Sequence, residues 1–543
     1  MKIALAQLNY CIGDIEGNTA KIVDAAHHAQ SEGADLVVFS ELSVCGYFPF
    51  DCLEFTDFLE RCVNALDVIA TRCHDIAVLV GCPVPNKTEG QKPLYNAAVL
   101  LDHGQRQVFN KKQIGSNPLF DERKYFQPAG DDRLLEFGGH RIAVVIGDDL
   151  RNQGSDPILM ENRMDDLMSQ KPDLVIALAA SAFDYTMPRY RCNTLRQTVL
   201  KHELPLVMVN QVGAHSHLIF DGGSMAFASN GHVDTALPFF KEAIQIVNTD
   251  TLTFFRTAED QLEIPEKMSL IHDALVMGIH DYFYKLNFKD AVIGLSGGLD
   301  SALVTYFAVK ALGPEHVRVV LLPSQFSTDH SVTDAEDLAK KLGIVYDTVP
   351  IKPIYDSFMT ALQPVFEGRP FDVTEENLQA RIRAVILMAV SNKFGNVLLN
   401  TSNKSEASVG YGTLYGDMCG GLSVIGDVYK MEAYALARYI NKVEEIIPWH
   451  TITKAPSAEL RPDQKDSDSL PEYDVLDKIL FQYIEESHSA EEIIAQGFEE
   501  ATVRRVIRMV NRNEFKRKQV APILRVSPKA FGTERVLPIV AKL

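Results

Sequence analysis

A Gly-rich turn between an apolar run and a helix-like stretch most constrains what this chain can fold into. The residues Ser296-Gly297-Gly298-Leu299-Asp300-Ser301 follow the apolar run 291–295 and precede the largely apolar segment 302–308. Glycines let backbone N–H groups approach an anion closely, and hydroxyl groups and a helix N-terminus add further attraction. The turn has no lysine after its glycines, unlike a Walker A loop, and offers the carboxylate of Asp300 instead. This pairing predicts a phosphate group bridged by magnesium, bound on a strand–turn–helix unit.

Length and composition predict a folded protein with at least two domains. The chain has 543 residues, of which 46% are hydrophobic and 23% charged, and one hydrophobic core rarely organises so many. A net charge of −19 argues against broad binding to nucleic acid or to an anionic membrane surface. The eight cysteines lack metal-ligand spacing. We recognise no signal peptide and no apolar stretch long enough to span a membrane, so we expect a cytoplasmic protein.

Short apolar runs alternate with helical patterns, which is typical of α/β folds. We expect a first domain over residues 1–247, a polar linker over 248–267 and a second domain over 268–543. A helix over about 268–284 should lead into the strand before the Gly-rich turn, with a doubly wound parallel sheet at the centre of the second domain. The strands expected in the first domain are 3–6, 36–39, 76–80, 97–101, 142–146, 174–178 and 206–209.

The second domain resembles the NAD synthetase family, and the Gly-rich turn resembles the pyrophosphate loop of ATP pyrophosphatases. The resemblance rests on ordered sequence blocks at 375–383, 400–406, 410–417, 456–460, 466–471 and 514–519. It implies that ATP adenylates the nicotinate carboxylate of deamido-NAD and that ammonia then displaces AMP to give NAD. Adenylation is needed because a carboxylate oxygen is otherwise a poor leaving group, and the protein mainly positions groups and neutralises charge.

The same resemblance assigns roles to individual residues. Asp300 and Glu406 become the catalytic pair that holds Mg²⁺, for which hard carboxylate oxygens are suitable ligands. Asn377, Lys516 and Glu406 are assigned to deamido-NAD. The ATP-binding residues are Gly294, Leu295, Ser296, Gly297, Gly298, Leu299, Asp300, Ser301 and Thr401, with Lys404 and Lys430 as weaker candidates for phosphate contacts.

Each of these assignments has a structural alternative. In isolation Glu406 would fit a helix-surface acid, and Lys516 a solvated basic turn. The ordered blocks favour the functional interpretation. One departure is Ser402, where the family usually has glycine. A serine suits this loop only if its φ is negative or if strain is tolerated.

The first domain resembles the nitrilase-like carbon–nitrogen hydrolase domain that makes ammonia from glutamine in the two-domain synthetases. The resemblance implies an αββα sandwich. Glu41, in the block 40–47, would be the general base, and Lys112, in the block 110–114, the counterpart of the transition-state lysine. The strand 142–146 should deliver a nucleophilic cysteine, but it delivers Gly147. The segment 115–119 between these landmarks is one residue shorter than the family pattern.

A glycine at the nucleophile position predicts that glutamine hydrolysis is lost. No thiolate exists there to attack the carboxamide and form an acyl-enzyme. Cys45 and Cys82 are poor substitutes, since a free cysteine is usually a small buried residue. Glu41 and Lys112 would then persist as a vestigial site, either as a buried ion pair or with some remaining chemistry.

The sequence therefore predicts an NAD synthetase that takes ammonia from solution or from a separate ammonia-supplying protein, with ATP as substrate and Mg²⁺ as cofactor. By analogy with the family, we expect a homo-oligomer. Alternatives remain open: an active glutamine-dependent enzyme with another nucleophile, amidation of nicotinate mononucleotide, or a non-catalytic protein that binds or senses adenine dinucleotides. A pure binder has no obvious need for the two magnesium carboxylates, which favours the enzyme.

Overall fold

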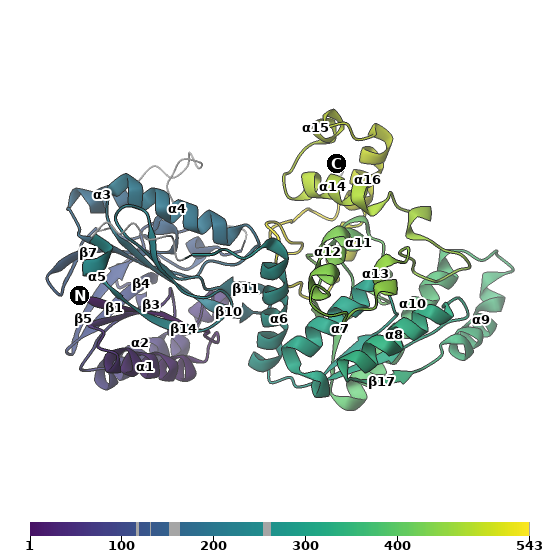
Figure 1. Ribbon diagram of the computed structural model, residues 1–543, viewed down its shortest axis with the longest axis horizontal. Helices are drawn as coiled ribbons and strands as arrows, with labels where there is room; N and C mark the ends of the chain where they lie inside the picture. The colour runs from purple at the N-terminus through teal and green to yellow at the C-terminus, as the bar shows by residue number, and fades with distance from the viewer. Residues whose placement is uncertain (116–118, 131, 151–162, 254–261, 542–543) are drawn as a thin grey trace. The chain divides into compact units, whose positions relative to one another are not determined.

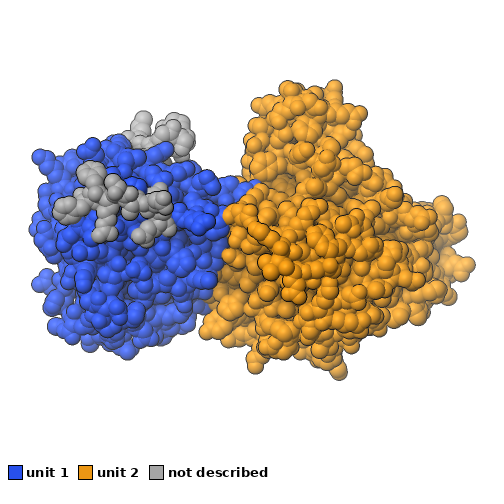
Figure 2. Space-filling model, in the orientation of Figure 1, with its two compact units in different colours: residues 1–265 blue, residues 266–543 orange. Residues whose placement is uncertain are grey.

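A computed structural model describes residues 1–115, 119–130, 132–150, 163–253 and 262–541. The chain divides into two compact units, Met1–Pro265 and Glu266–Leu543 (Figure 2). The predicted linker, residues 248–267, contains the short helix α5 (Thr249–Thr253), and its residues 254–261 lie outside the described part. Among the described residues, no helix combines the length and apolar character needed to cross a membrane.

Unit 1 is a sandwich of two six-stranded mixed sheets (Figure 1). The first sheet has the order β14-β1-β2-β3-β4-β5 and the second the order β13-β12-β9-β8-β7-β6, with parallel pairing at β1-β2-β3 and at β7-β8-β9. Strands β10 and β11 form a separate hairpin. The strands are β1 (Lys2–Gln7), β2 (Leu36–Val38), β3 (Ala77–Pro85), β4 (Leu94–Asp102), β5 (Gln105–Asn110), β6 (Leu135–Phe137), β7 (His140–Ile146), β8 (Leu174–Ala179), β9 (Leu206–Asn210), β10 (Val212–His215), β11 (Leu218–Asp221), β12 (Met225–Phe227), β13 (Val233–Ala236) and β14 (Ala243–Asn248).

Alternation along the strands creates three apolar layers in unit 1. Ile3 and Leu5 pack with Val144 and Ile176 between the two sheets. The opposite faces are covered by helices α1 (Ile15–Ser31) and α2 (Thr56–Arg72) on the first sheet, and by α3 (Arg163–Ser169) and α4 (Met187–His202) on the second (Figure 1). All seven strands predicted for the first domain are present, and the predicted sandwich is confirmed.

Unit 2 is built on a five-stranded parallel sheet with the order β17-β16-β15-β18-β19. The strands are β15 (Ala291–Gly294), β16 (Val317–Leu321), β17 (Val345–Thr348), β18 (Val397–Asn400) and β19 (Leu422–Ser423). The strand order reverses between β15 and β18, which is the point where open α/β sheets bind ligands beyond the carboxyl ends of their strands. The predicted doubly wound parallel sheet is thus confirmed.

The first helix of unit 2 is α6, whose bounds differ from those of the predicted helix 268–284 by one residue at each end (Figure 1). The helices of unit 2 are α6 (Lys267–Lys285), α7 (Leu299–Leu312), α8 (Asp329–Leu342), α9 (Lys352–Phe366), α10 (Val373–Phe394), α11 (Lys404–Val409), α12 (Lys430–Ile440), α13 (Trp449–Thr453), α14 (Tyr473–Ile484), α15 (Ala490–Ala495), α16 (Glu500–Arg512) and α17 (Glu514–Arg517). Helices α14, α15 and α16 contribute most of one core cluster, which includes Leu480, Val503 and Val506 and extends to Val409 of α11 and to Phe531. Helix α11, which follows the switch-point strand β18, packs against α14 and α16.

Candidate active site

The Gly-rich turn joins β15 to α7 at the switch point of the unit 2 sheet. The Ser296 and Ser301 hydroxyl oxygens lie 3.0 Å apart, and the Gly298 N–H donates to Ser296 Oγ at 3.2 Å. Gly297 has φ +80°, and a Cβ there would lie 2.0 Å from the carbonyl oxygen of Ser331. Glycine is therefore required at position 297 by both the backbone and the space. The turn therefore carries two hydroxyl groups and lies at the N-terminus of α7, the features on which the predicted phosphate site depends.

Asp300 and Glu406 converge on one ammonium group. Lys430 Nζ lies 2.6 Å from Asp300 Oδ2 and 3.5 Å from Glu406 Oε1. Asn403 adds a second link, since its Nδ2 donates to Asp300 Oδ1 at 3.3 Å and its Oδ1 accepts from the Glu406 N–H at 2.9 Å. Burial, together with the nearby Asp300 carboxylate, raises the pKa of Glu406 to about 8. The structure thus brings together the two carboxylates predicted from sequence, and it places Lys430 between them.

Asn377 and Lys516 contact a single segment, residues 410–413. Lys516 Nζ donates to the carbonyl oxygens of Gly410 and Gly412 at 2.8 Å, and the Thr413 hydroxyl donates to Asn377 Oδ1 at 2.8 Å. Burial lowers the pKa of Lys516. These two predicted dinucleotide-binding residues are distant in sequence but contact the same segment of the chain.

The loop after β18 shows no backbone strain at the unusual serine. Thr401 is half-buried, and the Ser402 N–H donates to Asn400 Oδ1 at 3.0 Å. Ser402 is not among the residues with positive φ. A serine therefore occupies this loop without the left-handed conformation that would favour glycine.

In unit 1, Glu41 follows β2 and joins a buried charge cluster. Lys111 Nζ lies 2.9 Å from Glu41 Oε1 and 2.7 Å from Glu122 Oε2, and Asn96 Nδ2 donates to Glu41 Oε1 at 2.7 Å. Gly147, directly after β7, points at the same cluster: a Cβ there would lie 2.6 Å from Glu41 Oε2 and 2.9 Å from Lys111 Nζ. Burial, only partly offset by Lys111, raises the pKa of Glu41 to about 7.

The structure corrects the predicted lysine of this cluster, which is Lys111 and not Lys112. Lys112 turns the other way and pairs with Asp132 at 2.7 Å and with Asp166 at 3.2 Å. Adjacent residues of an extended strand point to opposite faces, and Lys111 shares the face of the buried Phe109. That alternation is the signal that could have identified Lys111 from the sequence.

The structure also corrects one weaker phosphate candidate in unit 2. Lys404 is 0% exposed, and its ammonium group is enclosed by protein oxygens, so it is unavailable to a bound phosphate. In unit 1, burial raises the pKa of the Cys45 and Cys82 thiols well above the ordinary value, which suppresses their thiolate forms. The shortened segment 115–119 includes residues 116–118, which lie outside the described part of the chain.

Comparisons with known proteins account for both units. The NAD synthase family model matches residues 271–520, and the carbon–nitrogen hydrolase model matches residues 2–255. A glutamine-dependent NAD(+) synthetase from Synechocystis sp. is 43% identical, with 99% of this chain and 98% of that protein covered. The chain belongs to the glutamine-dependent NAD(+) synthetase family.

Other members of the family agree over the whole length. The glutamine-dependent NAD(+) synthetase of Acinetobacter baylyi is 41% identical, with 99% of this chain and 98% of that protein covered. The solved structure of the glutamine-dependent NAD+ synthetase from Acinetobacter baumannii, in complex with ADP, is 40% identical, with a TM-score of 0.79 and coverage of 99% and 98% of the two chains. The protein is an NAD synthetase, a carbon–nitrogen ligase.

The donor set of the synthetase site fits a magnesium ion that is shared with a substrate. Mg²⁺ prefers hard oxygen ligands and commonly takes one or two carboxylates together with phosphate oxygens. Asp300 and Glu406 supply two carboxylates, and Asp300 itself lies in the Gly-rich turn 296–301. In the described part of the chain, no group of three or more His, Cys, Asp or Glu side chains could hold a metal by itself. A magnesium ion held by Asp300 and Glu406 would complete its coordination with phosphate oxygens and water.

Proposed function

We propose that this synthetase amidates deamido-NAD with ammonia and has lost the hydrolysis of glutamine. One contrast carries the proposal. Asp300, Glu406 and Lys430 converge beside an intact phosphate-binding turn, whereas Gly147 offers no side chain to the Glu41–Lys111 cluster. The family name includes glutamine because ammonia is normally released in the first domain. This chain lacks the group that would start that release.

The chemistry proceeds in two displacements. A nicotinate carboxylate oxygen attacks the α-phosphorus of ATP, the bond to the β-phosphate oxygen breaks, and pyrophosphate leaves. Ammonia then attacks the acyl carbon, the bond to the AMP oxygen breaks, and nitrogen loses a proton to give the amide. The turn around Ser296 and Ser301 would hold the phosphates, and Asn377 and Lys516 the dinucleotide. Magnesium held by Asp300 and Glu406 would offset the charge on the departing pyrophosphate.

The proposed loss of glutaminase function follows from the covalent route. That route needs a nucleophile whose sulfur attacks the carboxamide and expels ammonia as an acyl-enzyme forms. At position 147 only a hydrogen atom stands where the side chain would begin. Ammonia would then enter from solution or from a separate ammonia-supplying protein.

The deciding experiment compares nitrogen donors. We expect NAD formation from deamido-NAD and Mg-ATP with ammonium, and neither NAD nor glutamate with glutamine alone. Glutamine-driven turnover with one glutamate released per NAD would show that another nucleophile replaces the missing one. Faster turnover of nicotinate mononucleotide than of deamido-NAD would revise the acceptor. Ligand binding without turnover and without magnesium dependence would support a sensor.

Replacement of Glu41 by alanine tests whether unit 1 takes part in the remaining chemistry. We expect kcat for ammonium-driven NAD formation to stay within about twofold, because the hydrogen bonds described for Glu41 join it to Asn96 and Lys111 in unit 1, whereas the proposed adenylation residues belong to unit 2. Steady-state kinetics at saturating ammonium would measure this, with circular dichroism to confirm folding. Complete loss of ammonium-driven turnover in a folded variant would falsify the idle role of unit 1.

A further inference from the structure

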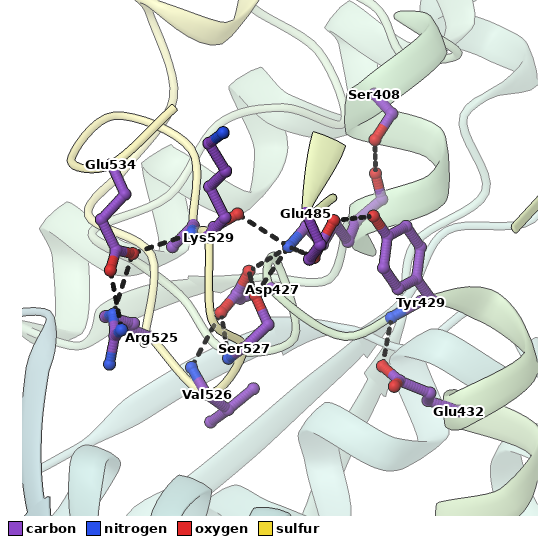
Figure 3. Close-up of polar contacts among 12 residues, drawn as sticks. Ser408, Asp427, Tyr429, Glu432, Glu485, Arg525, Val526, Ser527, Lys529 and Glu534 are labelled. Carbon is purple, nitrogen blue, oxygen red and sulfur yellow. Dashed lines mark hydrogen bonds and ion pairs between the residues drawn. The ribbon is translucent and has the colours of Figure 1, made fainter. Parts of the chain in front are cut away.

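Lys404 forms the centre of a fully buried polar cluster in unit 2. Its Nζ lies 2.8 Å from Asp427 Oδ1 and 2.5 Å from Glu485 Oε1, and it donates to Ser527 Oγ at 2.7 Å and to the Lys529 carbonyl oxygen at 3.0 Å. In Figure 3, Asp427, Glu485, Ser527 and the Lys529 carbonyl oxygen, which come from three segments of the chain, surround one nitrogen atom. One ammonium group therefore joins parts of unit 2 that are up to 125 positions apart in sequence.

The cluster is built to keep this lysine charged. Burial opposes the charged form, but Asp427 and Glu485 outweigh burial and raise the pKa of Lys404. The outer oxygens of both carboxylates are also occupied: Asp427 Oδ2 accepts from the Val526 and Ser527 N–H groups at 2.8 and 2.7 Å, and Glu485 Oε2 accepts from the Tyr429 hydroxyl at 2.8 Å (Figure 3). A buried, paired and fully hydrogen-bonded charge is held in one geometry.

Asn403, the residue before Lys404, contacts the Asp300 carboxylate and the backbone of Glu406. Asn403 caps helix α11 by accepting from the Glu406 N–H, and its amide donates to Asp300. The Lys404 N–H itself donates to the Val428 carbonyl oxygen at 2.9 Å. A shift of Lys404 would therefore move the cap that contacts the Asp300 carboxylate and the first turn of α11 at Glu406.

The residue after Lys404 fixes Lys430. Ser405 Oγ accepts from the Lys430 N–H at 2.8 Å and donates to Asp477 Oδ1 at 2.5 Å, while Asp477 Oδ2 accepts from the Met431 N–H at 2.8 Å. The start of helix α12 is thus held by the same turn that Lys404 anchors. The consecutive residues 403–405 therefore contact all three charged residues of the site, which are Asp300, Glu406 and Lys430.

We propose that Lys404 is a positioning residue for adenylation, and that the C-terminal segment 526–530 belongs to the synthetase site through it. The segment contacts Lys404 and Asp427, and Lys404 holds the turn that orients Asp300, Glu406 and Lys430. Reacting groups must be placed within a fraction of an ångström, so a support of this kind acts on the rate of the chemical step more than on binding. This inference rests on the synthetase activity and is independent of the nitrogen source.

The test compares Lys404→Met with Arg525→Met in the full chain. Arg525 is also buried, and its guanidinium pairs with Glu534 at 2.7 Å in the same C-terminal region (Figure 3). Arg525→Met therefore also removes a buried, paired cation and serves as the matched control. We expect Lys404→Met to lower kcat by about 10- to 100-fold, with the KM for ATP changed less than about threefold, as for other supporting contacts. Arg525→Met should lower the unfolding temperature similarly and keep kcat within about threefold.

A milder variant covers the case in which Lys404→Met does not fold. Ser527→Ala removes one contact to Lys404 and one to Asp427 Oδ1, and we expect a kcat reduction of at least about threefold without loss of folding. Unchanged kcat in a folded Lys404→Met, or in Ser527→Ala where Lys404→Met is unfolded, would overturn the proposal. Equal kcat losses in Lys404→Met and Arg525→Met would also overturn it, because general destabilisation would then suffice.

The assay separates this proposal from the proposed function. The single burst of pyrophosphate release from ATP and deamido-NAD, measured without any nitrogen donor, reports the rate of adenylation alone, because the adenylate is not consumed until ammonia displaces AMP. Failure of the wild-type protein to use ammonium would refute ammonia-dependent synthesis, while the effect of Lys404→Met on pyrophosphate release would still decide the role of Lys404.

Discussion

Replacing Asp300 with alanine should reduce ammonium-driven NAD formation by about 10³-fold, because a metal that offsets transition-state charge contributes several kcal/mol. Asp300 stands at the start of helix α7, 2.6 Å from Lys430 Nζ, and shares that ammonium group with Glu406. Without its carboxylate, the pair predicted to hold magnesium is broken and Glu406 is left alone with Lys430. Pyrophosphate release and NAD formation should fall together, since adenylation precedes amidation.

Asp290 provides a control carboxylate before strand β15, whereas Asp300 lies after that strand, in the first turn of α7. The Asp290 side chain is 42% exposed and accepts a hydrogen bond from His316 at 2.8 Å. We expect Asp290→Ala to keep kcat within about twofold, as for most exposed positions. An Asp300→Ala protein that is folded and retains more than about a tenth of the wild-type rate would contradict the assigned role.

Replacing Lys111 with methionine should destabilise unit 1 by about 3–5 kcal/mol, the usual result of removing one partner from a buried ion pair. Lys111 is 1% exposed and lies between Glu41 and Glu122, so methionine would leave two buried carboxylates without a counter-charge. The neighbouring Lys112→Met should cost no more than about 1 kcal/mol, because partly exposed ion pairs contribute little. The Lys112 side chain is 17% exposed and pairs with Asp132 and Asp166.

Differential scanning calorimetry of both variants would measure this difference. The unfolding transition assigned to unit 1 should move to a clearly lower temperature in Lys111→Met and shift little in Lys112→Met. Equal shifts in the two variants, or a larger shift in Lys112→Met, would contradict the arrangement of charges in the cluster.

Local patterns carried most of what could be predicted. The turn at 296–301 combines strand, glycines, hydroxyls and helix within a dozen residues, so its structure depends on few distant contacts. The buried strands of both units were likewise predictable because parallel strands covered on both faces form short apolar runs. Asp300 and Glu406, although 106 positions apart by their numbering, meet because β15 and β18 are neighbours in the sheet.

The remaining features depend on which way a side chain points. Lys111 and Lys112 are adjacent residues of the same type, and they differ in which face of the extended chain their side chains occupy: Lys111 is buried and Lys112 is not. A lysine at position 404 is a residue type that commonly binds phosphate, but its ammonium group binds Asp427, Glu485 and Ser527 instead. These partners are far from Lys404 in sequence, so no local sequence pattern predicts the contacts. Long-range burial of this kind is set by tertiary packing, which sequence spacing does not encode.

The backbone at Gly147 limits which residues this position can hold. Its φ of +48° is a conformation that glycine adopts freely and that costs other residues roughly 1–3 kcal/mol. A side chain there would also crowd the Glu41 carboxylate. The turn therefore favours the one residue that has no side chain. A cysteine placed at position 147 would have to adopt the left-handed backbone conformation and displace the Glu41 carboxylate, so the substitution would act on the stability of unit 1 as well as on any chemistry there.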